Sequence, residues 1–238
     1  MEPSLYVSLS GQLALQRRLD TIANNVANSA TSGFRAENVT FDSILSRREI
    51  AYSGVGNTTF SNASGSLIQT ENPLDMAIQG DAYFAIATPA GTAYTRDGRF
   101  RASATGDLET LEGFRVLDSG GAPLQINPAL GPVQIARNGL ASQNGNRIGT
   151  IGLFKLPVDA ALSRGPGAGL VSDKPGETVI DFSATGIAQG YVEGANVNPM
   201  LEMTRMIAVS RSFEALSASM DQSDRKLVDA IRALGGAR

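Results

Sequence analysis

The sequence of 238 residues contains neither cysteine nor histidine. Without cysteine there can be no disulfide, no thiolate nucleophile and no cysteine-ligated zinc site. Without histidine the Ser-His-Asp and Cys-His catalytic arrangements are impossible, as are histidine-ligated metals and imidazole acid/base catalysis. The catalytic chemistry that remains is a Ser/Lys pair, a pair of carboxylates or a cation held by oxygen ligands.

The chain also lacks a run of about 18 apolar residues, which excludes a membrane-spanning helix. Its opening residues, MEPSLYVSLSGQLALQRRLD, carry neither a basic leader nor a sustained apolar stretch, so we expect no cleaved signal peptide. The net charge of -3 and the pI of about 5.1 provide no dominant basic face. A nucleic-acid partner is therefore not expected.

Acidic residues that could form a catalytic pair all lie within or beside turn signals. An aspartate in a turn usually accepts hydrogen bonds from the local backbone, which is a structural role. We therefore expect no enzyme activity, no metal, no cofactor and no small-molecule substrate. These acidic residues are Asp75, Asp81, Asp97, Asp107 and Glu109.

The C-terminal segment shows an alternating 4-3 spacing that is typical of a coiled-coil seam. Eight of the ten seam positions are apolar, and Met203 and Ile231 lie beside them. A helix from about Met200 to Leu234 would be roughly 50 Å long, more than a small domain usually requires. An ordinary core helix is the alternative interpretation. The seam consists of Glu202, Met206, Val209, Phe213, Leu216, Met220, Ser223, Leu227, Ala230 and Leu234.

The N-terminal segment predicts a second, weaker amphipathic helix that ends near Val26. Ser8 and Gln12 interrupt its seam, so this helix should not be stable alone. Gly33 can take a left-handed conformation where the chain leaves the helix. The seam consists of Leu5, Ser8, Gln12, Leu15, Leu19, Ile22 and Val26.

Between the two helices the pattern indicates short strands separated by turns. Asn-Gly or Asp-Gly pairs at Asp97, Asn138 and Asn144 are signals of type I′ hairpins. An antiparallel sheet is therefore expected over roughly 68–157, and the turn-rich stretch 163–178 is expected to be a long loop.

Three blocks resemble one family, the flagellar rod and hook proteins. They are ANNVANSATSGFR at 23–35, LDMAIQGDAYFAIATPAGTAYTRDGRFRASATGDLETLEGFRVL at 74–117, and EGANVNPMLEMTRMIAVSRSFEA at 193–215. With their flanking sequence they cover over half of the chain in the expected order. The opening SLYVSLSGQ and the short central region are most similar to the proximal-rod members, and a distal-rod member is the alternative.

The resemblance implies a structural subunit of the periplasm-spanning rod that assembles through its terminal helices and transmits torque. It further implies export by the flagellar apparatus without a cleaved leader, with other rod subunits and copies of the chain itself as partners. The signature residues by position are Asn24, Asn25, Ala27, Asn28, Thr31, Gly33, Phe34, Asn196, Val197, Asn198, Glu202, Met203, Met206, Arg211 and Phe213. Periodicity adds Leu15, Leu19, Ile22, Val26, Met220, Leu227 and Ile231 to this predicted assembly interface.

The predicted fold class is α+β, with coiled-coil-like paired N- and C-terminal helices flanking a central antiparallel β-rich domain. The expected division is a discontinuous helical domain over 1–36 with 188–238, an irregular linker over 37–67 and the β-rich domain over 68–187. A different class of function, a secreted β-rich glycan-binding or hydrolytic domain, would need a concave pocket with convergent polar groups.

Overall fold

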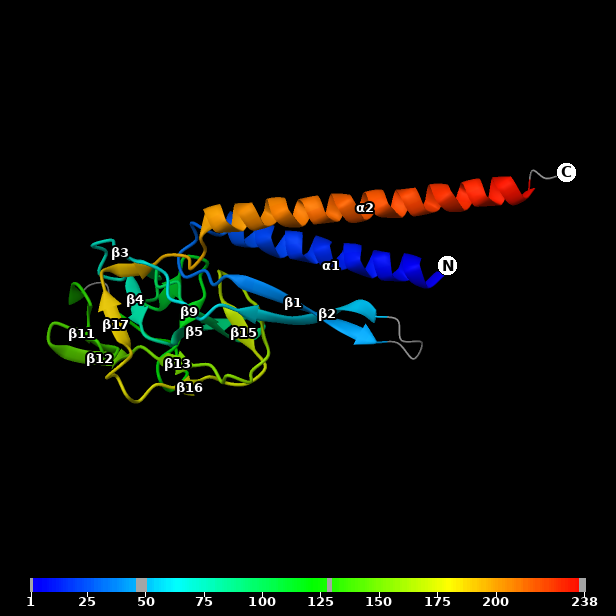
Figure 1. Cartoon of the computed structure of the whole chain (residues 1–238). Coiled ribbons are helices and arrows are strands. Elements are labelled where there is room, and N and C mark those ends of the chain that lie inside the picture. Colours follow the sequence, from blue (N-terminus) through cyan, green and yellow to red (C-terminus); the bar gives the residue numbers. More distant parts are fainter. Residues whose placement is uncertain (1, 46–50, 128–129, 236–238) are drawn as a thin grey trace. The chain divides into compact units, whose positions relative to one another are not determined.

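Figure 1 shows a computed structural model, which describes residues 2–45, 51–127 and 130–235. The chain mixes α and β structure and forms two compact units. The helical unit comprises Met1–Ala27, Glu37–Thr59 and Asn198–Arg238. The sheet unit comprises Asn28–Ala36 and Phe60–Val197.

The helical unit contains the helices α1 (Glu2–Ala27) and α2 (Pro199–Gly235) and a two-stranded sheet of β1 (Glu37–Leu45) and β2 (Ala51–Phe60). The helices lie side by side and antiparallel in Figure 1, and Gln12 Nε2 donates a hydrogen bond to Ser217 Oγ at 2.9 Å. With 37 residues against 26, α2 continues past the start of α1. Neither helix, over its described residues, is long and apolar enough to span a membrane.

The end of α1 and the start of α2 each lie within one residue of the predicted position. The residue that precedes α2, Asn198, accepts a hydrogen bond from Leu201 N, and Pro199 occupies the first helical position, where its missing N–H costs nothing. The helix α1 ends at Ala27, and Gly33 follows with a φ of 69°. The predicted left-handed exit at this glycine is confirmed.

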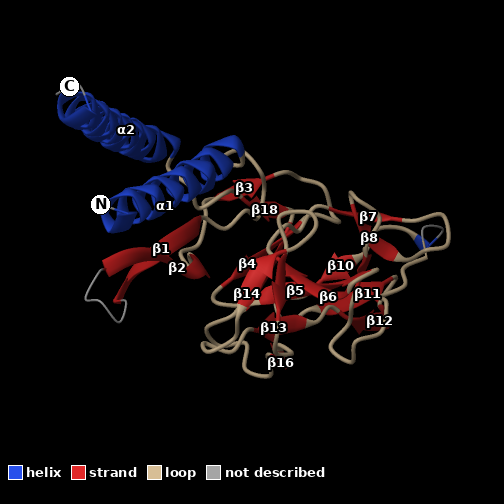
Figure 2. Cartoon of the chain, turned by 90° about the vertical axis from the view of Figure 1, so that its right-hand side faces the viewer, coloured by secondary structure: helices blue, strands red, loops and turns tan. Residues whose placement is uncertain are grey.

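The sheet unit is built from short antiparallel strands (Figure 2). The main sheet has the strand order β14-β15-β6-β5-β9-β8-β7, and β13 pairs with both β5 and β16. Three smaller sheets complete the unit, the pairs β17-β4 and β18-β3 and the three-stranded β10-β11-β12. The strands are β3 (Leu67–Gln69), β4 (Met76–Gln79), β5 (Tyr83–Thr88), β6 (Gly91–Thr95), β7 (Phe100–Ala102), β8 (Leu108–Thr110), β9 (Arg115–Val116), β10 (Gln134–Ile135), β11 (Leu140–Gln143), β12 (Asn146–Thr150), β13 (Leu153–Lys155), β14 (Leu162–Arg164), β15 (Leu170–Ser172), β16 (Glu177–Thr178), β17 (Gly186–Gln189) and β18 (Tyr191–Glu193).

Apolar side chains from β4, β5 and β7 form the main core of the sheet unit. Met76, Phe84 and Phe100 are fully or almost fully buried, and the rings of Phe84 and Phe100 meet edge to face at 5.1 Å. Burial of a Phe or Met side chain contributes about 1.5–3 kcal/mol, so this cluster stabilises the sheet unit without any help from the helices.

Two expectations for the chain between the helices were wrong. The segment 37–67, expected as an irregular linker, contains β1, β2 and the first residue of β3. Its periodicity is weak because a two-stranded hairpin buries little surface of its own. The stretch 163–178, expected as one long loop, contains most of β14 and all of β15 and β16, whose two or three residues are too short to show an alternating pattern.

The predicted hairpin turns had three different outcomes. Asn144 and Gly145 both have positive φ and join β11 to β12, which confirms the type I′ turn. Gly139 has positive φ within a longer connection between β10 and β11. The prediction at Asp97 was wrong, because β6 and β7 do not pair with each other. Gly98 is required there for another reason: a Cβ would lie 1.5 Å from the carbonyl oxygen of Met76.

Candidate functional site

The predicted seam is covered over its middle part and exposed near the end of α2, where Ser223, Ala230 and Leu234 lie open to solvent. Ile22 on α1 and Val209 on α2 are buried, at 5% and 6% exposure. The described seam positions that are half-buried are Ser8, Gln12, Leu15, Leu19, Val26, Met206, Phe213, Leu216 and Met220. The backbone of Leu227 and Ile231 lies in α2, and their side chains fall outside the described part of the structure.

Asn25 ties α1 to the first residue of β1. Its Nδ2 donates to the Glu37 carbonyl oxygen and its Oδ1 accepts from Glu37 N, both at 2.9 Å, so the amide side chain pairs with the backbone as a neighbouring strand would. The same Nδ2 lies 3.5 Å from Glu202 Oε2, and Arg205 Nη1 donates to the other carboxylate oxygen at 2.5 Å. Asn25 is therefore a junction within the helical unit.

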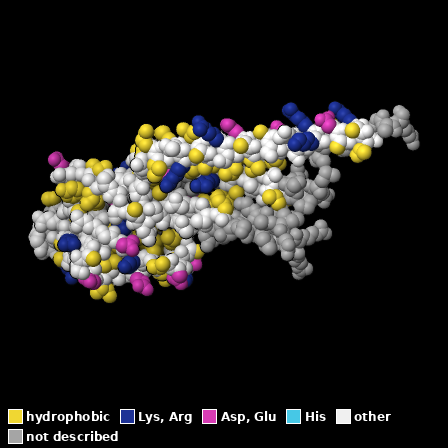
Figure 3. Space-filling view, in the orientation of Figure 1, with side chains coloured by type: hydrophobic (Ala, Val, Ile, Leu, Met, Phe, Trp, Pro, Cys, Tyr) yellow, Lys and Arg dark blue, Asp and Glu magenta, His cyan; other side chains and the backbone are white. Residues whose placement is uncertain are grey.

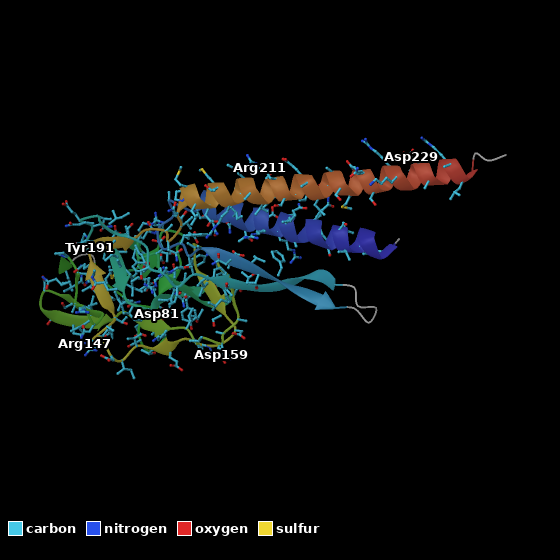
Figure 4. All side chains as sticks on the ribbon, in the orientation of Figure 1. Asp81, Arg147, Asp159, Tyr191, Arg211 and Asp229 are labelled. Atoms are coloured by element: carbon cyan, nitrogen blue, oxygen red, sulfur yellow. The ribbon has the colours of Figure 1, made fainter. Side chains whose placement is uncertain are left out.

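A second apolar face of α2 is open to solvent. Met203 and Ile207 are 47% and 56% exposed, and Met200 and Leu201 beside them are more than 40% exposed as well. Figure 3 shows hydrophobic side chains gathered over the start of α2. Arg211 is exposed and projects from the side of α2 that faces away from α1 (Figure 4). These residues are free to contact another chain.

Asn196 belongs to the sheet unit and binds three backbone groups. Its Oδ1 accepts from Ala36 N at 2.6 Å, and its Nδ2 donates to the carbonyl oxygens of Ser61 at 3.1 Å and Ala63 at 2.7 Å. Its own backbone N–H donates to the Phe34 carbonyl oxygen at 3.2 Å. Asn196 thus connects the N-terminal signature to the C-terminal one, whereas Asn198 two residues later is the helix cap.

The segment Asn28–Ala36, called the signature loop below, is packed into the sheet unit. Thr31 N donates to the Asn28 carbonyl oxygen at 3.0 Å. Only glycine fits at Gly33, because a Cβ there would lie 2.1 Å from Asp97 N. The Phe34 ring is buried with the Arg164 guanidinium 4.3 Å from its centroid. Such cation–π contacts contribute on the order of 0.5–2 kcal/mol.

A buried group of three charges, called the Arg–Glu cluster below, lies beside the signature loop. Arg35 Nη2 lies 3.0 Å from Glu193 Oε1 as an ion pair without hydrogen-bond geometry, and Arg96 Nη1 donates to Glu193 Oε2 at 3.2 Å. Side-chain exposures are 2%, 1% and 1% for Arg35, Arg96 and Glu193. Further bonds run from Arg35 to the Ala63 carbonyl oxygen and from Arg96 to that of Gly80.

Burial lowers the pKa of the Arg96 guanidinium from its ordinary value, and the nearby Arg35 cation lowers it further, while Glu193 opposes both effects. Burial also raises the pKa of the Tyr83 hydroxyl, whose ring lies 5.0 Å from the Arg96 guanidinium. Sequence reasoning missed this cluster, because a buried arginine cannot be told from a solvated one without its partner.

The remaining signature positions are spread over both units. Asn24 and Val197 are half-buried, and Asn198 is exposed apart from its cap bond. The predicted residues are divided between the two units, as helix-face positions in the helical unit and anchoring positions around Asn196 in the sheet unit.

Asp97 and Asp107, two of the acidic residues weighed for catalysis, are held by neighbouring side chains. Asp97 Oδ2 accepts from Arg99 Nη2 at 2.7 Å, and the Asp97 hydrogen bond is the main reason that the Arg99 pKa is raised. Asp107 Oδ2 lies 3.2 Å from Arg115 Nε, and its Oδ1 accepts from Gln125 at 3.2 Å. Asp97 Oδ1 also accepts from the backbone N–H of Arg99 at 3.1 Å, which is the turn role expected of it, whereas Asp107 is held by side chains.

Comparisons with known proteins find matches along most of the chain. Family models match at residues 5–35 (flagella basal body rod protein), 77–143 (flagellar hook protein FlgE/F/G D1 domain) and 188–232 (flagellar basal body rod FlgEFG protein C-terminal). The chain is 49% identical to the flagellar basal-body rod protein FlgF of Mesorhizobium japonicum over 99% of both chains, and 41% identical to FlgF of Rhizobium meliloti over 100% of both. It is 31% identical to the rod protein FlgG of Bacillus subtilis over 96% of this chain and 97% of the relative.

Proposed function

The chain belongs to the flagellar basal-body rod protein family, and from this premise we propose how it works as a structural subunit of the proximal rod. Its place is the basal body of the bacterial flagellum, among other rod and flagellar components. The higher identity to two FlgF relatives than to an FlgG relative supports the proximal rather than the distal rod. No catalytic step is needed for this role.

The observation that carries the mechanism is the exposed apolar surface on both helices. Leu9 and Leu13 on α1 and Met203 and Ile207 on α2 are between 44% and 56% exposed. The seam positions pair α1 with α2 in a coiled-coil-like manner, and the exposed faces are then buried against neighbouring subunits. Heterologous contacts of this kind build open helical assemblies, which is the geometry that a rod requires.

The sheet unit is a packed body that the chain joins to both helices. Its core and the bonds around Asn196 resist deformation of this unit. We propose that the assembled subunit transmits torque through its contacts with neighbouring subunits. We propose that the chain reaches this place through the flagellar export apparatus without a cleaved signal peptide, and that copies of itself are among its neighbours.

The test is complementation of a deletion strain with a chain that carries Ile207→Asp. Ile207 is exposed, so the isolated chain should keep the wild-type unfolding midpoint, whereas burial of an unpaired carboxylate in the assembled rod would cost several kcal/mol. Swimming should be lost, and the variant should be missing from purified basal bodies. Ser212→Asp, at an exposed polar position of the same helix, is the matched control and should swim. Normal incorporation of the Ile207→Asp chain would refute the proposed use of this face.

A further inference from the structure

The Arg–Glu cluster holds more positive than negative charge. Within the described residues, Glu193 is the only buried carboxylate that contacts Arg35 and Arg96. Asp81 lies 3.9 Å from Arg96 but is 54% exposed, so water already screens it. The two buried cations therefore depend on a single counter-ion.

Removal of that counter-ion would leave two guanidinium groups buried side by side. The two cations repel each other, so Arg35 lowers the pKa of Arg96, as burial also does. Removal of one partner from a buried ion pair strongly destabilises the folded state, because it leaves an uncompensated charge in the interior. Arg35 lies on the signature loop, whereas Arg96 directly follows β6 of the main sheet, so we expect the repulsion to displace the signature loop first.

The backbone of the signature loop depends on the same C-terminal segment. Gly33 N donates to the Glu193 carbonyl oxygen at 2.7 Å, and Asn196 N donates to the Phe34 carbonyl oxygen at 3.2 Å. Gly65 N in turn donates to Glu193 Oε1 at 2.8 Å. Residues 33–36 thus have both their charge partner and part of their backbone pairing in 193–196.

We propose that Glu193 is a positioning residue that couples two attachments within the sheet unit. One is the attachment of the signature loop, which follows α1, and the other is that of the residues that precede α2. The signature loop, from which α1 extends, is fixed on the sheet only when Glu193 is in place, and the residues leading into α2 are fixed at the same time. The two stretches of chain that lead into the helices are then fixed on the sheet unit together or not at all. The significance for assembly rests on the proposed function, but the coupling itself is a property of the isolated chain.

The experiment is amide hydrogen exchange on the purified full-length chain with Glu193→Gln, which keeps the shape and removes the charge. Peptides covering 28–36, 60–66 and 191–197 should lose protection together, with exchange about a hundredfold faster, while β5 and β6 keep wild-type rates. Asp81→Asn removes the exposed carboxylate near Arg96 and is the matched control. It should leave all of these peptides unchanged.

A charge-balance role also predicts a rescue that a packing role does not. Addition of Arg96→Met to Glu193→Gln removes one of the two unpaired cations and returns the net charge of the cluster from +2 to the wild-type +1, so the double variant should regain at least tenfold of the lost protection at 28–36. If Glu193→Gln alone fails to fold, recovery of a folded sheet in the double variant supports the proposal equally. Retained protection of 28–36 in Glu193→Gln would overturn it, and so would losses that simply add in the double variant. Because the measurement needs no rod, either result leaves the rod role to its own test.

Discussion

Asn196 and Asn198 are separated by one residue and use their amide groups in opposite ways. Asn196 donates two hydrogen bonds and accepts one, whereas the Asn198 side chain accepts from Leu201 N. Aspartate has nearly the same shape as asparagine, but an ionised carboxylate can only accept. Substitution by aspartate should therefore lower the free energy of unfolding at position 196 but not at position 198.

At Asn196→Asp the carboxylate would face the carbonyl oxygens of Ser61 and Ala63, which now receive its N–H groups at 3.1 and 2.7 Å. Ala63 keeps its bond from Arg35, so Ser61 is the orphaned acceptor. Two lost bonds and an added repulsion together should lower the free energy of unfolding of the sheet unit by about 2–4 kcal/mol. At Asn198→Asp the cap bond is kept and a negative charge meets the helix N-terminus, so the change should be neutral or stabilising by about 0.3–1 kcal/mol.

Urea unfolding of the purified full-length chain, followed by the fluorescence of its five tyrosines, measures both effects. Desolvation and the two carbonyl oxygens should raise the pKa of the introduced carboxyl at 196. Protonation of this carboxyl at acid pH should restore one hydrogen-bond donor, so the two variants should differ less in their free energy of unfolding. A loss below about 1 kcal/mol at Asn196→Asp, or equal losses at both positions, would refute the hydrogen-bond assignment on which the anchoring argument depends.

Three further outcomes are expected. Phe213→Asp or Met220→Asp places a carboxylate at a half-buried seam position, so the sheet unit should remain folded while the chain fails to enter the rod and the cells do not swim; normal motility would contradict the seam. Limited proteolysis of the dilute monomer should remove α1 and α2 and leave a sheet core with ends near Asn28 and Val197, as read by mass spectrometry, and full protection of both helices would contradict their dependence on neighbours. Asp97→Asn and Asp107→Asn should each cost about 1 kcal/mol or less and support swimming, because asparagine also suits these turns; glycan hydrolysis by the wild-type chain that either change abolished would instead make the sheet unit an enzyme.

The helices were predictable because their signals are local. The 4-3 spacing from Glu202 to Met220 matches the covered face of α2, and the stop after Val26 and the cap at Asn198 can be read from neighbouring residues. The type I′ turn at Asn144 is equally local, since both of its residues must adopt positive φ. Side-chain chemistry and backbone preference within a few residues decide each of these features.

The anchoring positions were not predictable, because their partners are distant in sequence. Arg35, Arg96 and Glu193 each look like an ordinary surface charge, and only the folded chain brings them together. The glycine after Asp97 was read as a turn former, whereas its small size serves the close approach of the Met76 carbonyl oxygen. Composition alone cannot distinguish these two uses of glycine.

The polar break in the α1 seam also has a physical role. Gln12 bonds to Ser217 on α2, and such a hydrogen bond contributes about 1 kcal/mol net, less than the 1.5–3 kcal/mol expected for a buried leucine. A polar pair in a helix interface favours one register over shifted ones, because a shift breaks the bond between Gln12 and Ser217. We therefore expect the pairing of α1 and α2 to be well specified but weak. The apolar surface that remains exposed on both helices is then available for burial against neighbouring subunits, so that assembly supplies the stability that the isolated pair lacks.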